Sequence, residues 1–197
     1  MFLRLHEHSA DSSLLDHAAT AIRQDLRRCV QDRYGALHVN EEWRTLPYIS
    51  DGSVGIGFVV DDYLAYRYDE RFAEAAPRIS RAAESGFYAL SGLFSGRAGM
   101  ILYRSRGLPA GTAALDPVVA AHVRRLDWHA MSYRGHLAFP GNQLLRLSMD
   151  LATGTAGVLL ALGAVLHDDP VHLPFLGPVR PGVSRPEPDV LVMTERR

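Results

Sequence analysis

Three glycine motifs recur along the chain, each with a polar residue directly before its first glycine. They share the order polar, Gly, any residue, small or Val, Gly, aliphatic, and they start at Asp51, Ser95 and Thr153. Free N–H groups at the start of a helix favour an anion or a developing oxyanion, so chemistry is expected where such starts gather. The candidate catalytic residues are therefore those beside the first glycines: Asp51, Ser95, Arg97 and Thr153.

Apolar and amphipathic helical segments alternate along the chain and must position these residues. The apolar segments follow the motifs and are predicted over residues 53–66, 96–103 and 155–166. Amphipathic patterns, typical of surface helices, cover residues 11–30, 70–84 and 118–126. The sequence therefore predicts an all-α protein built from a repeat of helical hairpins, with inner and outer helices.

The two glycines of each motif need a packing reason, because glycine in a helix costs about 0.5–1 kcal/mol relative to alanine. The first is expected to permit the turn into the helix. The second is expected to let neighbouring helix starts approach one another around an axis, as at one end of an α/α toroid.

The segments between the helices carry weaker signals. Residues 34–40 predict a loop or a short strand pair, and residues 128–149 predict a small β-hairpin insertion around the turn Pro140-Gly141-Asn142. Residues 177–197 contain several prolines and are predicted to be a C-terminal tail.

Composition excludes several classes of function. The chain has no lysine, which excludes P-loop NTPases, protein kinases and pyridoxal-phosphate enzymes. Its net charge of −1 disfavours nucleic acid and anionic membranes as partners, and no segment has the length of a membrane span. The single cysteine, Cys29, permits neither an intrachain disulfide nor a thiolate cluster, which suits a reducing cytoplasm.

Longer stretches of sequence around the three motifs resemble those of a particular protein family. Together with the three motifs they are Trp43-Arg44-Thr45-Leu46-Pro47-Tyr48, Gly92-Leu93-Phe94-Ser95 and Leu147-Ser148-Met149-Asp150-Leu151-Ala152-Thr153. Over roughly residues 11–176 the chain resembles the LanC-like cyclase domain at the C-terminus of class III lanthionine synthetases.

The resemblance implies an α/α toroid of about seven helical hairpins, of which residues 1–176 would supply about three. The implied reaction adds a cysteine thiol of a precursor peptide to dehydroalanine or dehydrobutyrine, which forms a thioether ring. The implied partners are the precursor peptide and either an N-terminal kinase, lyase and cyclase portion or a second copy of the chain.

Zinc-dependent relatives of this family hold their metal at positions that correspond here to Ser50, Phe94 and Ser95. Hydroxyl groups and a phenyl ring do not replace thiolate and imidazole donors, so we expect neither zinc nor another cofactor. Cyclisation would then need a base, an acid and hydrogen-bond donors from the protein, and Asp51, Ser95, Arg97 and Thr153 are the candidates.

Other interpretations stay open. The chain could be a non-catalytic remnant or a peptide-binding scaffold that requires a missing half or a partner. The pair Asp61-Asp62 invites comparison with Mg²⁺-dependent terpene cyclases, but it lacks a third carboxylate one turn further on and better fits the polar edge of an inner helix. An α/α-toroid glycosidase is disfavoured because Asp51 is the only acidic residue at a motif start.

Overall fold

The structure is a computed structural model that describes residues 1–109, 111–174 and 176–177. These residues contain seven α-helices: α1 (Phe2–Ser9), α2 (Ser13–Leu26), α3 (Ser53–Leu64), α4 (Glu70–Ala82), α5 (Arg97–Ser105), α6 (Pro117–Arg125) and α7 (Thr155–Leu166). The all-α prediction is confirmed in part, because the fold is mainly helical but also contains two small sheets. The predicted tail from residue 178 onward lies outside the described residues.

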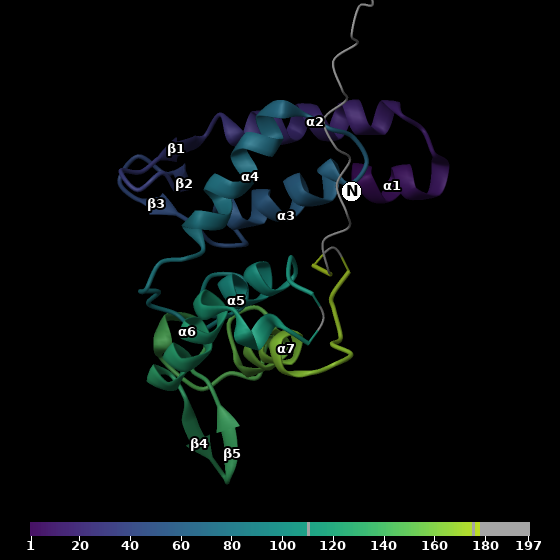
Figure 1. The fold of residues 1–197 in the computed structure, drawn as a ribbon. Coiled ribbons are helices and arrows are strands. Elements are labelled where there is room, and N and C mark those ends of the chain that lie inside the picture. Colours follow the sequence, from purple (N-terminus) through teal and green to yellow (C-terminus); the bar gives the residue numbers. More distant parts are fainter. Residues whose placement is uncertain (110, 175, 178–197) are drawn as a thin grey trace, which may run out of the picture.

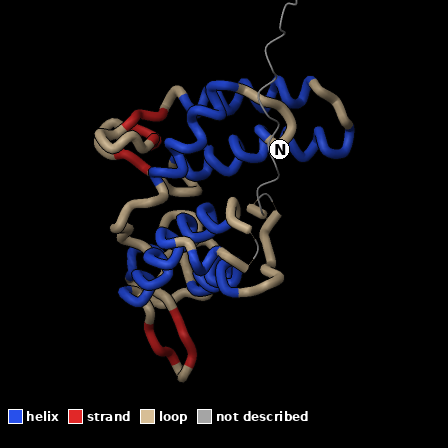
Figure 2. Tube along the Cα trace, viewed as in Figure 1, coloured by secondary structure: helices blue, strands red, loops and turns tan. Residues whose placement is uncertain are grey.

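Successive helices pack as hairpins, α1 with α2, α3 with α4 and α5 with α6 (Figures 1 and 2). Further packing of α2 on α3, of α3 on α5 and of α5 on α7 joins the hairpins around a shared hydrophobic core. Local signals begin the outer helices: Asp69 caps α4 by accepting from Phe72 N at 3.2 Å, and Asp116 caps α6 ahead of Pro117.

A three-stranded antiparallel sheet follows α2, and its first strand begins where helix was still predicted. It comprises β1 (Cys29–Gln31), β2 (Leu37–Asn40) and β3 (Thr45–Leu46), so the prediction of helix to residue 30 is wrong. The Asp32 carboxylate organises the intervening turn, because its Oδ1 accepts from Tyr34 N at 2.8 Å and from Ala36 N at 2.9 Å. The turn folds β1 back onto β2 and adds a sheet to the all-α prediction.

The predicted hairpin insertion exists, but its turn lies elsewhere. β4 (Met131–Tyr133) pairs with β5 (His136–Ala138) through the two-residue loop Arg134-Gly135, and the hairpin projects from the helical body (Figure 1). Both loop residues have positive φ, 51° and 81°, as a type I′ turn requires. Pro140-Gly141-Asn142 instead leads into a short 3-10 helix, Asn142–Leu144.

None of the helices in the described part of the chain combines the length and the apolar character needed to cross a lipid bilayer.

Candidate functional site

The three motif loops lie side by side, joined by main-chain hydrogen bonds. Ser50 N donates to Phe94 O at 3.0 Å, and Phe94 N donates to Ala152 O at 3.0 Å. Ser50, Phe94 and Ala152 occupy equivalent positions, each two residues before the first glycine of its motif. The helix starts therefore lie next to one another, as the repeat predicts.

The second glycines permit a close contact within each loop in addition to the predicted contact between loops. A Cβ at Gly55, Gly99 or Gly157 would press against the carbonyl oxygen six residues earlier in its own loop. Each loop therefore folds back tightly over the first turn of the helix that it precedes. The predicted close approach between neighbouring loops is also present: a Cβ at Gly99 would lie 3.0 Å from Ile49 Cδ1, and one at Gly157 would lie 2.7 Å from Leu93 Cβ. A further close approach between loops falls at Gly92, where a Cβ would lie 2.8 Å from Thr153 Cα.

At the joined loops, Ser50 links two of the predicted site residues, Asp51 and Ser95. Ser50 Oγ donates to Asp51 Oδ1 at 2.8 Å and lies 3.1 Å from Ser95 Oγ. We call Ser50, Asp51 and Ser95 the mouth cluster; Ser50 and Asp51 are exposed, and Ser95 is half-buried. Sequence reasoning named Ser50 only as a lost ligand position, although its place in the repeat could have marked it.

Thr153 belongs to a separate group around Asp150, which sequence reasoning did not select. Thr153 N donates to Asp150 Oδ1 at 2.7 Å, and Thr153 Oγ1 donates to Asp150 Oδ2 at 2.9 Å. The hydrogen bond from Ser148 Oγ and the bond from Thr153 N are the main causes that lower the pKa of Asp150 to about 2. This carboxylate is held by its own loop and is a weak proton acceptor.

The structure does not bring Arg97 to the mouth cluster. Its side chain is fully buried, with Nη1 3.2 Å from His122 Nδ1 and the guanidinium over the rings of Tyr88 and Trp128. Desolvation, and then the nearby charge of Arg125, lower the pKa of Arg97. The contacts found for this guanidinium within the described residues lead to α6, to the 3-10 helix Leu126–Trp128 that follows it, and to the segment between α4 and α5.

The buried side chain of His122 predicts that the folded protein loses stability in acid. Its Nε2 donates to Ala83 O at 2.9 Å, so the neutral ring accepts from Arg97 at Nδ1. Burial, together with neighbouring cations, lowers the pKa of His122 from 6.5 to about 4. His122 therefore binds a proton more weakly in the folded state than in the unfolded state. Its contribution to the free energy of unfolding is present above pH 6.5 and should be lost as the pH falls toward 4.

We expect His122→Gln, which keeps a donor and does not titrate, to reduce this acid-induced loss. Urea unfolding of both proteins at pH 7, 5.5 and 4 measures it, and the difference between them isolates His122 because all other titrating groups are shared. Parallel pH dependence in the two proteins would contradict the assignment.

The residues at the zinc positions of the resembled family are brought together, but they do not fit the metal. Ser50 and Ser95 contribute hydroxyl groups, and Phe94 contributes its carbonyl to the loop ladder. Over residues 1–109, 111–174 and 176–177, no three His, Cys, Asp or Glu side chains are grouped so that they could hold a metal ion. These three positions therefore do not supply the donors that a zinc site needs.

A cavity of about 510 Å³ borders the mouth cluster and lies between α1, α2 and α3. Ser50 and Asp51 line it on one side, and apolar side chains such as Phe2, Ile22 and Ile56 line it on the others. The cluster is thus reached from solvent beside an apolar wall.

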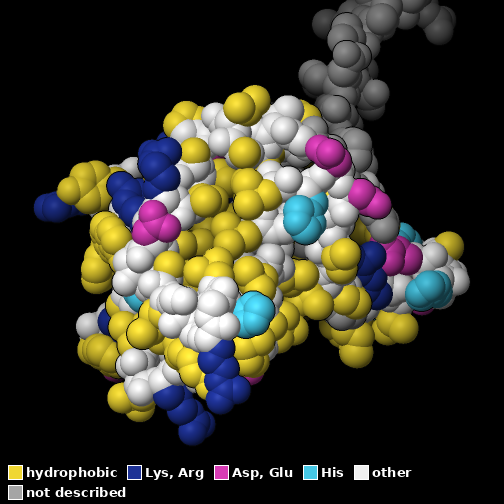
Figure 3. Space-filling model, turned by 90° about the horizontal axis from the view of Figure 1, so that it is seen from below, with side chains coloured by type: hydrophobic (Ala, Val, Ile, Leu, Met, Phe, Trp, Pro, Cys, Tyr) yellow, Lys and Arg dark blue, Asp and Glu magenta, His cyan; other side chains and the backbone are white. Residues whose placement is uncertain are grey.

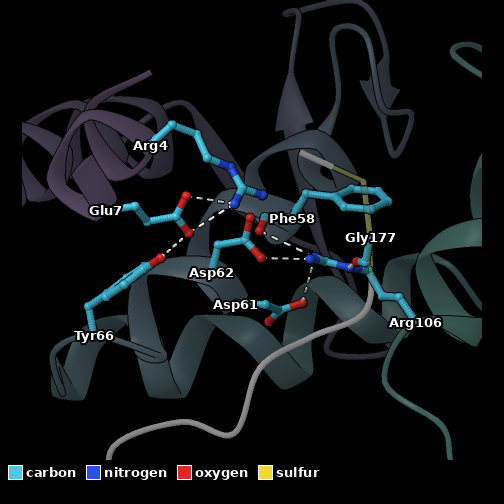
Figure 4. A network of polar contacts seen from close by, with 8 residues as sticks. All are labelled: Arg4, Glu7, Phe58, Asp61, Asp62, Tyr66, Arg106 and Gly177. Carbon is cyan, nitrogen blue, oxygen red and sulfur yellow. Dashed lines mark hydrogen bonds and ion pairs between the residues drawn. The ribbon is translucent and has the colours of Figure 1, made fainter. Parts of the chain in front are cut away.

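The pair Asp61-Asp62 is engaged by a buried guanidinium (Figure 4). Arg106 lies 2.6 Å from Asp62 Oδ1 and 3.8 Å from Asp61 Oδ2, and its Nε donates to Gly177 O at 2.7 Å. Burial is the main cause that raises the pKa of Asp61 to about 6. These carboxylates tie α3 to α5, which agrees with the polar-edge interpretation and not with a diphosphate site.

Comparison with known proteins finds a relative that matches most of the chain. No family model matches the chain. The chain is 56% identical over 180 residues to a protein named probable SapB synthase from Streptomyces coelicolor, and the match covers 91% of this chain and 19% of that protein. The chain thus spans about a fifth of the length of its curated relative. Over nine-tenths of its length it is similar to one segment of a probable SapB synthase.

Proposed function

We propose that the chain is a cyclase segment of a lanthipeptide synthetase that joins cysteine thiols of a precursor peptide to dehydrated residues without zinc. The observation that carries this proposal is the ladder of three glycine loops, which gathers Ser50, Asp51 and Ser95 at adjacent helix starts. The relative's name, SapB synthase, supports a role in making a peptide product.

The finer architecture belongs to the same proposal. The hairpins α1–α2, α3–α4 and α5–α6, followed by α7, would form part of an α/α toroid with the glycine loops at one end of its central funnel. A further portion of the synthetase, or a second copy of the chain, would complete the ring in the cytoplasm.

Asp51 is the general base in this proposal. It accepts from Ser50, whereas Asp150 is held by Ser148 and Thr153 and has a pKa of about 2. A thiol at Ser95 Oγ would pass its proton through the hydroxyl groups of Ser95 and Ser50 to Asp51. As the C–S bond forms, the C=C π electrons move toward the α-carbon, which then takes the proton back, so the addition is balanced.

Thr153 and Arg97 have positioning roles in this mechanism. Thr153 fixes the third loop through Asp150, and Arg97 supports the first turn of α5 from inside the core. Neither side chain contacts the mouth cluster in the described residues.

The test is loss of free thiol from a dehydrated SapB precursor peptide incubated with the full chain. Asp51→Asn should lower the rate about a hundredfold, because it removes the base but keeps an acceptor for Ser50. Asp168→Asn, at an exposed carboxylate after α7, is the matched control and should leave the rate unchanged.

Two results would contradict the proposal. One is that the free-thiol content of the precursor peptide does not change when the wild-type chain is added, even if the rest of the probable SapB synthase is also supplied. The other is equal rates for Asp51→Asn and the wild type. Peptide binding without turnover would favour the alternative, a non-catalytic scaffold, for which the exposed apolar side chains of the β4–β5 hairpin are the supporting observation.

A further inference from the structure

The mouth cluster lacks a cation for the negative charge that the proposed reaction develops. When a thiolate adds to the C=C bond of dehydroalanine, the π electrons move into the conjugated carbonyl group and leave a negative charge on its oxygen. Ser50, Asp51 and Ser95 supply a carboxylate and two hydroxyl groups, which are used to move the thiol proton. Arg97, the expected donor, is buried away from this cluster. The charge on the carbonyl oxygen therefore needs a donor from another element.

Two arginines line the cavity that borders the mouth cluster. Arg4 is engaged, because its Nη1 lies 2.9 Å from both carboxylate oxygens of Glu7. Arg28 is exposed, and its side chain has neither a hydrogen bond nor an ion pair within residues 1–109, 111–174 and 176–177. Of the two cations at the cavity, Arg28 is thus the one that can serve a substrate.

Main-chain hydrogen bonds fix the position of Arg28 relative to the first glycine loop. Arg28 follows the end of α2, and Asn40 N at the end of β2 donates to Arg28 O at 2.9 Å. Asn40 pairs in turn with Thr45 of β3, the strand that leads into the loop carrying Ser50 and Asp51. Arg28, Ser50 and Asp51 all line the same cavity. The cation and the proposed base are therefore held on one connected wall.

The carboxylates that line the cavity leave Arg28 unneutralised. Asp62 lies 2.6 Å from Arg106, and Asp25 forms no ion pair with Arg28 in the described residues. Asp25 keeps its charge, but it is exposed, so solvent screens its repulsion of an anion. Asp51 becomes neutral when it takes the thiol proton. The enolate thus forms between a neutral acid and the Arg28 cation.

The cavity also supplies an apolar surface for the alkene. It has a volume of about 510 Å³, and Ile22, Ile49 and Ile56 are among the residues that line it together with Ser50 and Arg28. The face at the hairpin end is mainly hydrophobic as well, but its arginines stand at the margins (Figure 3). At the cavity, by contrast, an apolar wall and an unpaired cation occur together, as a site for a dehydroamino acid requires.

We infer that Arg28 is a catalytic residue of the addition, whose guanidinium donates to the carbonyl oxygen of the dehydroamino acid and stabilises the enolate. The inference rests on the proposed function for the identity of the substrate. As the C–S bond forms, the C=C π electrons move into the carbonyl group, and its oxygen becomes the anion that Arg28 holds. The α-carbon then takes the proton from Asp51, the C=O bond forms again, and Arg28 is unchanged.

The test follows the addition of 2-mercaptoethanol to a dehydrated SapB precursor peptide whose cysteines are replaced by alanine, so that no ring can form. Mass spectrometry counts the adducts with and without the full chain. Arg28→Gln should lower kcat about thirtyfold with little change in KM, because the oxygen gains its charge only on the way to the enolate. The loss should be smaller than in an enclosed oxyanion hole because Arg28 is exposed.

Three further variants make the test specific. Arg27→Gln is the matched control, since Arg27 is an exposed neighbour that does not line the cavity, and it should leave the rate unchanged. Arg28→Lys keeps the positive charge and should recover most of the rate. At pH 9.5 much of the added thiol is already thiolate, so Asp51→Asn should regain most of its rate while Arg28→Gln stays slow. Thermal melts verify that all variants fold.

The outcomes separate this inference from the proposed function. Acceleration that is lost in Arg28→Gln and kept in Arg27→Gln supports the role of Arg28 even if the chain closes no ring in the intact precursor. Equal kcat for Arg28→Gln and the wild type overturns it even if cyclisation proceeds. A change in KM alone overturns it as well, since Arg28 would then only bind the peptide. Absence of any acceleration by the wild type also overturns it.

Discussion

Gly157→Ala should lower the free energy of unfolding by about 3 kcal/mol. A Cβ at this position would press on the carbonyl oxygen of Leu151 and lie 2.7 Å from Leu93 Cβ. The first contact is to backbone within the same loop, so it cannot be relieved by a rotamer change. Either the loop must lift from α7 or the ladder to Phe94 must break, and urea unfolding measures the cost.

Gly163→Ala is the control within the same helix. A Cβ there would meet only ring atoms of His167 at 3.6 Å and 3.8 Å, which is ordinary contact. Alanine should therefore stabilise the protein by about 0.5–1 kcal/mol through its higher helix propensity. If Gly157→Ala and Gly163→Ala changed the free energy of unfolding by similar amounts, the third loop would not fold back over the first turn of α7 as described.

Arg106→Met should lower the free energy of unfolding by about 3–5 kcal/mol. The Arg106 side chain is 2% exposed, and it neutralises Asp62 at 2.6 Å while donating to Phe58 O at 3.3 Å. Without the guanidinium, Asp61 and Asp62 remain together in a largely buried setting. Calorimetric melts at pH 7 measure the loss, which should shrink toward pH 4 as Asp61 becomes protonated.

Arg97→Met is the matched comparison, since it also replaces a buried arginine. Arg97 has no carboxylate partner in the described residues, and its removal leaves two neutral acceptors, His122 Nδ1 and Gly86 O, without this donor. Stability should stay within about 1 kcal/mol of the wild type. If Arg97→Met were as damaging as Arg106→Met, the importance of the carboxylate pair would be refuted.

The sequence predicted helices best where apolar character and a starting signal coincide. Residues 155–166 form α7 as predicted, because Gly154 precedes an entirely apolar segment. The first amphipathic pattern ran on through Cys29, although the chain leaves the helix at Leu26. The Asp32 turn and the pairing of Cys29 with Val39 decide this, and helical periodicity carries no information about a strand partner.

The candidate site was predictable in outline from the repeat. Equivalent positions in stacked motifs must lie near one another, which is why Asp51 and Ser95 share a cluster. The link through Ser50 depends on how two loops stack, and the burial of Arg97 depends on rings supplied by Tyr88 and Trp128. Neither feature leaves a signal in the spacing of the motifs.

The ladder at Ser50, Phe94 and Ala152 uses only peptide groups. A hydroxymethyl, a benzyl and a methyl group therefore occupy three equivalent places without altering the pairing of the loops. Scaffold and reactivity are carried by different atoms at these positions. Evolution can thus exchange one functional group for another there while the architecture persists, which makes this end of the molecule a site where new chemistry is readily acquired.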